Sequence, residues 1–273
     1  MPNNSVNTNV ASMVALRNLN ITNDALNATQ DRVSTGLKVI GAKDDASSFA
    51  IAQGIRADLK AFKAVEQALA NGKGIGDVAL GGLTSISNLL TDMKKKAIEG
   101  MNAGNTPQQQ TILNADYAAM VQRFTNFIAN SSYNGKNLLS VGSADAAVIA
   151  TISGGTMSLS AQGAIGSLVT SLGSLPDITT AAAALSAINV AITAVGTALG
   201  DLGSDLNSLN AQIEFNKQVS DSTEEGLGSI VDADLAAESA KLQALQVKQQ
   251  LGVQAVSIAN SAPQILLSLF RGG

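Results

Sequence analysis

The fold is decided by residues 185–213, LSAINVAITAVGTALGDLGSDLNSLNAQI. Apolar side chains recur there in steps of three and four residues without a break: Leu185, Ile188, Ile192, Val195, Leu199, Leu202, Leu206, Leu209 and Ile213. An apolar period of about 3.5 residues keeps one face of a helix turned toward a partner helix, as in a coiled coil. We therefore expect a long helix here, with Leu199, Leu206 and Ile213 in the core of a helical bundle.

Two further segments repeat this spacing. The longer one contains Phe62, Val65, Leu69, Gly72, Gly76, Ala79, Leu83, Ile86, Leu90, Met93 and Ala97, and the shorter one contains Leu113, Tyr117, Met120, Phe124 and Phe127. Leu69, Leu83, Leu90 and Phe124 are their candidate core residues. Glycine is a poor helix former. We expect the two glycines in this seam to let a neighbouring helix approach closely. Three such seams predict at least three helices that share one long core.

The joints between these segments carry their own signals. Thr106, Pro107 and Gln109 predict a helix start, because Thr caps a helix, Pro fits the first turn and Gln completes a capping box. The second and third seams are therefore expected to form an antiparallel pair. Asn134-Gly135 predicts a tight turn, and Pro176-Asp177 predicts the start of the long Ala-rich helix.

Residues 138–176 differ in character from the rest of the chain. Gly154-Gly155 separates residues 150–153 from residues 156–160, two short segments in which apolar residues alternate loosely with Ser, Thr and Gly. This pattern predicts a β-hairpin. The sequence as a whole therefore predicts a mainly α protein, a long coiled-coil helical bundle with a small β-hairpin insertion.

The composition excludes several classes of function. The 273 residues include no Cys, His or Trp, which excludes thiol catalysis, Ser-His triads and most zinc hydrolases. The net charge is only −4, whereas a general nucleic-acid binder is normally basic. No phosphate-binding glycine loop follows a predicted strand. We therefore expect no enzymatic activity, no catalytic residue, no metal, no cofactor and no nucleic-acid partner.

Both chain ends are nearly free of charge and apolar at helical spacing. Residues 1–23 hold one charged side chain, Arg17, and residues 242–273 hold two, Lys248 and Arg271. The first end has one stripe of Leu16, Leu19, Leu26, Val33 and Leu37, and a second of Val10, Val14 and Ile21. The last end has one stripe of Val247, Leu251, Ile258, Ile265 and Leu269, and a second of Leu242, Leu245, Val256 and Ala259.

A helix with two apolar stripes needs partners on more than one side. An ordinary buried core helix would also satisfy this pattern. Because both ends of the chain share it, we favour assembly between copies of the chain. The candidate assembly interface is the Leu16-to-Leu37 stripe together with Leu251, Ile258, Ile265 and Leu269.

Residues 178–200 carry no charged side chain and are long enough to span a membrane. The stretch also contains Thr179, Thr180, Ser186, Asn189, Thr193 and Thr197, and its strongest apolar residues fall on one stripe. We therefore prefer a buried helix and expect no membrane partner. The first residues are Asn-rich and lack a basic start, so they do not match a classical secretory signal.

Several motifs resemble those of one family, the bacterial flagellins. Its signature stretch is similar to residues 34–46, STGLKVIGAKDDA. Residues 3–26, rich in Asn, resemble its amino-terminus, and residues 230–234 (IVDAD) and 259–271 (ANSAPQILLSLFR) resemble its carboxy-terminus. Residues 134–139, NGKNLL, match the turn after its second helix.

The resemblance implies a structural subunit that is exported unfolded by the flagellar type III apparatus and polymerises into the extracellular filament for swimming motility. It implies an inner, channel-lining coiled coil made of residues 1–43 with 233–273, and a helical bundle made of residues 44–232. Residues 138–176 leave no room for large outer domains, so the chain looks like a minimal flagellin. The implied partners are other copies of the subunit, an export chaperone at the C-terminal segment, and hook-associated and cap proteins.

Lys43, Asp44 and Asp45 lie at the bend between the end helix and the bundle. They either form polar contacts between subunits and fix the geometry of the bend, or cap the following helix, because Asp favours a helix start. Around the charge run at Lys94-Lys95-Lys96, the places where the animal innate receptor engages many flagellins hold Thr91, Lys95 and residues near Asp116. The resemblance therefore predicts weak recognition by that receptor.

Besides a soluble coiled-coil adaptor, which would form a stable small oligomer without polymerising, two alternatives to a filament subunit stay open at this point. A hook–filament junction protein of the same superfamily shares the architecture of the ends. A membrane-inserting translocator of a secretion system would account for the uncharged residues 178–200. The Asp44-Asp45 signature and the Leu-Phe-Arg tail favour flagellin over the first, and the polar residues of the stretch disfavour the second.

Overall fold

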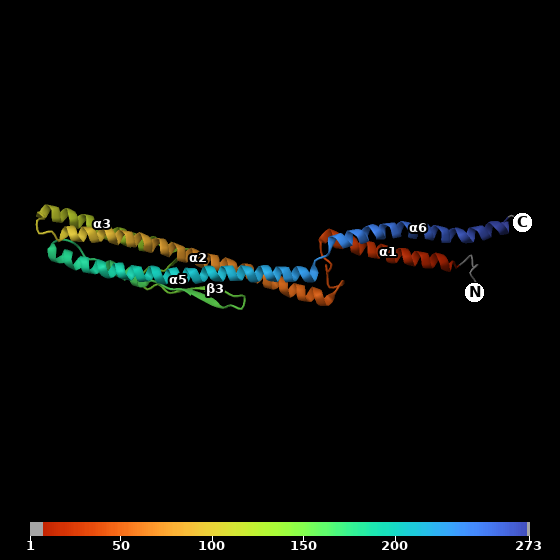
Figure 1. The fold of residues 1–273 in the computed structure, drawn as a ribbon, viewed down its shortest axis with the longest axis horizontal. Coiled ribbons are helices and arrows are strands. Elements are labelled where there is room, and N and C mark those ends of the chain that lie inside the picture. Colours follow the sequence, from red (N-terminus) through yellow and green to blue (C-terminus); the bar gives the residue numbers. More distant parts are fainter. Residues whose placement is uncertain (1–7, 272–273) are drawn as a thin grey trace. The chain divides into compact units, whose positions relative to one another are not determined.

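The computed structural model describes the backbone of residues 8–271 and the side chains of residues 8–261 (Figure 1). It confirms a mainly α fold with a small β insertion. The helices are α1 (Val10–Thr35), α2 (Ala46–Gly100), α3 (Pro107–Asn130), α4 (Gly163–Ser171), α5 (Ile178–Val231) and α6 (Leu235–Arg271). The strands are β1 (Ser132–Tyr133), β2 (Lys136–Asn137), β3 (Ala146–Ile149) and β4 (Thr156–Leu159).

The chain forms two compact units. Unit 1 comprises the residues up to 57 together with those from 223 onward, and unit 2 comprises residues 58–222. The division falls within α2 and α5, so each of these long helices contributes to both units. The domains proposed from the resemblance divide the chain instead at the bends, near residues 43 and 233.

Unit 2 is built around the three expected seams. In Figure 1, α2, α3 and α5 lie lengthwise along one another, and their buried side chains join those of β3, β4 and α4 in one cluster. Leu69, Leu83, Leu90 and Phe124 are completely buried, and Leu206 is nearly so. Leu199 and Ile213 are partly buried and pack against the same cluster.

The seam of α5 differs in phase from the expected one over its first half. Its fully buried positions alternate between large and small side chains: Ala184, Ile188, Ala191, Val195, Ala198 and Leu202. Leu185, Ile192 and Leu199, the residues chosen from the sequence, each lie one position further along and are only partly buried. Alanine occupies the centre because helices that pack closely leave room there for one methyl group, and the larger side chains flank it.

Within the described part of the chain, one helix, α5, is long and apolar enough to cross a membrane. One stripe of that stretch is packed into the core of unit 2. The opposite side exposes Ser186, Asn189, Thr193 and Thr197. Three of their hydroxyl groups donate to carbonyls one turn earlier in the helix. This distribution is that of an amphipathic bundle helix.

The expected signals at the joints are present. Thr106 Oγ1 accepts a hydrogen bond from Gln109 N at 3.3 Å, and Gln109 Oε1 accepts one from Thr106 N at 2.8 Å, which completes the capping box of α3. Asp177 Oδ1 accepts a hydrogen bond from Thr180 N at 2.8 Å at the start of α5. Asn134 and Gly135, with φ of 49° and 77°, form the turn between β1 and β2.

The predicted β-hairpin is present, but its first strand begins earlier in the chain than the sequence pattern indicates. β4 lies where the sequence predicts it, whereas β3 spans 146–149 rather than 150–153, with Ile149 opposite Thr156. Residues 150–155 form the connection, which is closed by a hydrogen bond from Ala150 N to Gly155 O at 2.8 Å. Burial sets the register, because Ala146 and Val148 alternate with exposed residues and cover the bundle.

Helix α4 was not expected from the sequence. It is short, has no side-chain cap and contains two glycines, so local signals for a helix are weak. Gly166 is required by packing: a Cβ there would stand 2.7 Å from Val141 N and 2.9 Å from Leu139 O. Tertiary contact with the chain at 139–141 therefore determines where this helix lies.

Polar side chains of α3 hold the segment that follows α4. The Tyr117 hydroxyl donates to Leu172 O at 2.6 Å, Gln110 Nε2 donates to Leu175 O at 2.8 Å, and Asn114 Oδ1 accepts from Leu175 N at 2.8 Å. Tyr117 is completely buried, and this burial raises the pKa of Tyr117 to about 12. These bonds satisfy backbone groups that would otherwise be unpaired in the core.

We expect Tyr117→Phe to change the response of unit 2 to alkali. The variant leaves the Leu172 carbonyl unpaired, which should cost about 1–3 kcal/mol of unfolding free energy at neutral pH. Because folding raises the pKa of Tyr117 above its ordinary value near 10, its neutral form adds stability below pH 10 that is lost as the pH rises toward about 12. Urea unfolding at pH 8 and pH 11 should show a smaller loss for the variant than for the parent. Tyr133→Phe, at a partly exposed residue, is the control, and an equal alkaline loss in all three proteins would contradict the assignment.

The glycines of the α2 seam allow close approach, as expected, but only one of them faces a helix. A Cβ at Gly76 would stand 2.5 Å from Leu206 Cδ2 of α5, whereas a Cβ at Gly72 would stand 2.5 Å from Val148 Cγ2 of β3. Gly81, on the same helix, has open space around it.

Alanine substitutions at Gly72 and Gly81 should therefore have opposite effects. Gly81→Ala gains helix propensity and should stabilise the protein by up to about 1 kcal/mol. Gly72→Ala gains the same propensity but overpacks the core against the stiff Val148, so we expect a net loss of about 1 kcal/mol. Urea unfolding followed by circular dichroism measures both. Equal stabilisation by the two substitutions would show that the hairpin does not press on α2.

Candidate assembly surface

Unit 1 contains the two terminal helices, which lie against each other (Figure 1). Along α6 the less exposed residues again follow steps of three and four: Leu242, Leu245, Gln249, Gly252, Val256 and Ala259. On α1 the corresponding residues include Leu19, Leu26 and Val33, which are partly buried. Leu19 Cδ1 lies 3.1 Å from where a Cβ of Gly252 would stand, so glycine lets the helices approach there.

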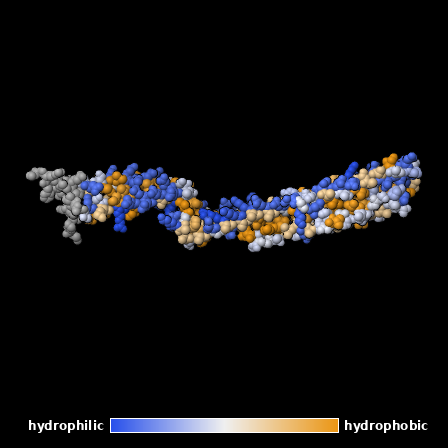
Figure 2. All heavy atoms as spheres, turned by 180° about the vertical axis from the view of Figure 1, so that it is seen from behind, coloured by the Kyte–Doolittle hydropathy of each residue, from blue (hydrophilic) through white to orange (hydrophobic). Residues whose placement is uncertain are grey.

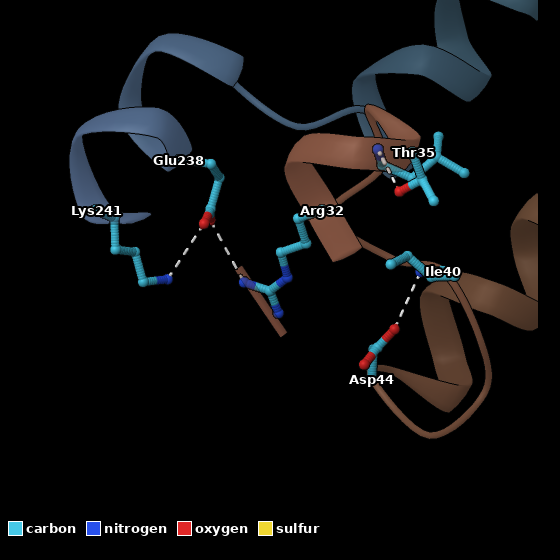
Figure 3. Close-up of polar contacts among 7 residues, drawn as sticks. Arg32, Thr35, Ile40, Asp44, Glu238 and Lys241 are labelled. Atoms are coloured by element: carbon cyan, nitrogen blue, oxygen red, sulfur yellow. Dashed lines mark hydrogen bonds and ion pairs between the residues drawn. The ribbon is translucent and has the colours of Figure 1, made fainter. Parts of the chain in front are cut away.

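Among the residues whose side chains are described, four of the polar contacts between the start of the chain and α6 are spread along the length of the pair. Gln249 Nε2 donates to Asn23 Oδ1 at 2.8 Å, Ser12 Oγ donates to Asn260 Oδ1 at 2.6 Å, and Asn9 Nδ2 donates to Ala259 O at 2.7 Å. Arg32 Nη1 lies 3.5 Å from Glu238 Oε1, and Lys241 Nζ lies 3.5 Å from Glu238 Oε2 (Figure 3). The two residue numbers of each interhelical pair add up to between 268 and 272, so all four contacts share one antiparallel register.

Backbone contacts set the same register at the base of the pair. Gly36, with φ of 74°, ends α1, and its carbonyl accepts from Ala233 N at 2.8 Å. Lys38 N donates to Val231 O at 2.8 Å. A small core of Val39, Ala52 and Val231 lies beside this bridge, and Leu37 packs against it. Leu37 thus contacts its own chain in this structure.

Two of the bend residues, Asp44 and Asp45, accept hydrogen bonds from their own chain. Asp44 Oδ2 accepts from Ile40 N at 3.1 Å and from Gly41 N at 3.2 Å, which closes the loop (Figure 3). Asp45 Oδ1 accepts from Ser47 N and Ser48 N, and its Oδ2 accepts from the Ser48 hydroxyl at 2.7 Å. These bonds from Ser48 hold the pKa of the Asp45 carboxyl below its ordinary value. Asp45 therefore caps α2, while Lys43 is exposed.

The remaining faces of α1 and α6 expose apolar side chains, which we call the outer apolar faces. On α1 they are Val10, Met13, Val14 and Ile21, and on α6 they are Val247, Leu251, Val253 and Ile258, each more than half exposed. Leu16 is 49% exposed and borders the first group. Figure 2 shows hydrophobic residues in orange on the visible surface of this part of the molecule. The side chains of Ile265 and Leu269 lie outside the described residues.

Exposure of the outer apolar faces to water is unfavourable in free energy. Complete burial of one Val, Leu or Ile side chain is worth about 1.5–3 kcal/mol. Exposed apolar patches on a soluble protein mark interaction surfaces. The fold and this surface together define a class of protein: a helical bundle whose paired terminal helices expose an apolar face.

Comparison with known proteins identifies the family. The family model for the bacterial flagellin N-terminal helical region matches residues 6–145, and that for the C-terminal helical region matches residues 185–270. Flagellin FljO of Caulobacter vibrioides is 38% identical over 275 aligned residues, which cover 98% of this chain and 99% of that protein. The chain belongs to the bacterial flagellins. It is a structural subunit of the extracellular flagellar filament, exported by the flagellar apparatus.

Solved structures agree at the level of the fold. The crystal structure of Bacillus cereus flagellin has a TM-score of 0.50 and 22% identity, covering 55% of this chain and 88% of that one. A putative flagellar hook-associated protein from Vibrio parahaemolyticus has a TM-score of 0.58 and 17% identity, covering 69% of this chain and 100% of that one. At such identities the likeness shows the fold alone. The full-length sequence relatives favour a filament subunit over the junction protein and the translocator.

We expect Asp45→Ala and Asp45→Asn to separate capping from contact between subunits. Asp and Asn side chains both cap a helix well, whereas Ala cannot. The Ala substitution should therefore lower the free energy of unfolding by about 1 kcal/mol. If Asp45 acts as a cap, the Asn variant should form filaments as the parent does, and the Ala variant should lose thermal stability. Sedimentation of filaments and thermal unfolding of free subunits measure the two effects. A loss of filaments in the Asn variant, with stability unchanged, would instead assign Asp45 to contact between subunits.

Proposed function

We propose that the outer apolar faces of α1 and α6 are the surface through which copies of this flagellin pack in the filament. The observation that carries the proposal is that each terminal helix has two apolar stripes, one packed against the other terminal helix and one exposed to water. Leu242, Leu245, Val256 and Ala259 of α6 lie toward α1 and are less exposed, whereas Val247, Leu251 and Ile258 stand in water. A pair of helices can cover only one face of each member, so the second face requires another molecule.

The paired helices form the inner domain of this proposal. Residues 1–43 with 233–273 line the central channel, and residues 44–232 form the helical layer around it. Of the interface residues predicted from the sequence, Leu251 and Ile258 lie on the outer apolar faces and Leu16 borders them. Leu19, Leu26 and Val33 are partly buried on the side of α1 that meets α6, so they belong to the contact within the chain and are not proposed as contacts between subunits. The side chains of Ile265 and Leu269 lie beyond the described residues. Leu16, Leu251 and Ile258 are the most exposed of these residues, so they are the side chains that a neighbouring subunit is proposed to bury.

Before assembly the same surface needs protection. The proposed partner is a flagellar export chaperone that binds the C-terminal segment. This is supported by the exposed apolar residues of α6, since a protein that travels to its assembly site with such a face uncovered is liable to aggregate. Hook-associated and cap proteins are proposed to meet the ends of the filament through the same kind of surface.

Charge substitutions on α6 test the surface directly. Leu251→Asp or Ile258→Asp should leave the free subunit as stable as the parent, because both side chains are exposed there. Each should abolish filament growth, because assembly would bury a carboxylate without a partner. Leu251→Met and Ile258→Leu keep an apolar side chain of similar volume and should assemble.

The measurement is growth of filaments from short seeds, followed by electron microscopy and sedimentation. Circular dichroism of each free variant serves as the control for folding. Normal filaments from both Asp variants would refute this role for the outer face of α6.

A further inference from the structure

One carbonyl of α6 has lost its helical hydrogen-bond donor. In an α-helix the carbonyl of each residue accepts from the backbone N–H four positions later. Pro263 lies within α6, and proline has no N–H, so the Ala259 carbonyl has no donor from its own helix. Every other residue from 235 to 267 has a non-proline residue four positions later. Within residues 235–267 of this helix, Ala259 is therefore the one residue whose carbonyl loses its backbone donor to a proline.

The first turn of α1 supplies the missing donor. Asn9 Nδ2 donates to Ala259 O at 2.7 Å. The same side chain caps α1, because Asn9 Oδ1 accepts from Ser12 N at 3.1 Å. One partner needs a donor and the other an acceptor, so the two bonds together fix the orientation of the amide. Next to it, the Ser12 hydroxyl donates to Asn260 Oδ1 at 2.6 Å.

We infer that Asn9 is a positioning residue that pairs the start of α1 with the proline step of α6 and so fixes the register in which the two helices lie along each other. The apolar seam alone repeats every seven residues and would tolerate a slip by one repeat. After such a slip Asn9 would face a carbonyl that its own helix already satisfies, and Ala259 O would stay unpaired. The polar pair therefore specifies register at the end of the helices opposite the backbone bridge between Gly36 and Ala233.

This inference deepens the proposed function, on which it rests for its setting in the filament. By fixing the register, Asn9 and Pro263 also determine how Val10 and Val14 on the outer apolar face of α1 align with Ile258 on that of α6. One side chain thus serves both helices: Asn9 caps its own helix, α1, and also supplies the donor that α6 lacks at Ala259.

A double-mutant cycle tests the coupling. The variants are Asn9→Ser, Pro263→Ala and the two combined, assembled as full-length filaments. Serine retains the cap of α1 but is too short to reach Ala259 O. Pro263→Ala restores a backbone N–H to Ala259 O, so the Asn9 amide becomes redundant. Ser12→Ala, made in both backgrounds, is the matched control, because its bond to Asn260 does not involve the Ala259 carbonyl.

The readout is the temperature at which filaments disassemble, followed by light scattering. We expect Asn9→Ser to lower it in the parent and to lower it by less than half as much in the Pro263→Ala background. Ser12→Ala should lower it equally in both. Equal effects of Asn9→Ser in the two backgrounds, or no effect in the parent, would overturn the inference.

A further variant keeps the test decisive if Pro263→Ala does not assemble. Asn9→Asp retains a cap but places a carboxylate against the Ala259 carbonyl, so it should lower the disassembly temperature at least as much as Asn9→Ser. Disassembly of both variants at the temperature of the parent would overturn the inference. The effect of the Asn9 variants does not depend on which face neighbouring subunits cover. A negative result here would therefore refute the role of Asn9 alone, whereas normal filaments from Leu251→Asp would argue against the proposed assembly surface.

Discussion

Two helices in contact can each bury only one face, and this limit governs the terminal part of the molecule. The apolar seam between α1 and α6 takes up Leu19, Leu26 and the α6 residues from Leu242 to Ala259. Each helix nevertheless has a second apolar face, which pairing within the chain leaves in water. The excess apolar surface is large on the scale of protein stability, because each fully buried aliphatic side chain contributes about 1.5–3 kcal/mol. Burial by further subunits, without closure of the contact, gives an open helical array.

A helix pair with apolar surface on both sides needs specific polar contacts to fix how the two helices pair. The seam is almost free of charged residues, so polar side chains are few and each carries specific information. Glu238 lies between Arg32 and Lys241 near the base, Gln249 bonds to Asn23 in the middle, and Asn9 bonds to Ala259 O at the far end. The bridge beside Gly36 starts the pairing, and Asp44 and Asp45 hold the bend from which α2 begins.

Features determined by local sequence were predictable, and features determined by tertiary contact were not. The seam of α2, the capping box at Thr106 and the turn at Asn134-Gly135 follow from neighbouring residues, and all are present. The phase of α5 differs from the sequence prediction because Leu185 and Ile192 are larger apolar residues than Ala184 and Ala191, and only close helix packing favours alanine in the core. Strand β3 and helix α4 were misplaced or missed because burial against the bundle determines both. At the assembly surface, the two stripes were visible in the sequence, but which stripe of each helix faces inward was not. The bond from Asn9 to Ala259 O had one signal, a proline inside a helix, whose partner only the fold reveals.

Amide hydrogen exchange, compared between free subunits and filaments, tests the central claim that neighbouring subunits cover the outer faces of α1 and α6. Amides of α1 and α6 should exchange rapidly in the free subunit and become strongly protected in the filament. Those of α2, α3 and α5 within residues 58–222 should be protected in both states. Equal protection of α1 and α6 in the free subunit and in the filament would show that neighbouring subunits do not cover these faces.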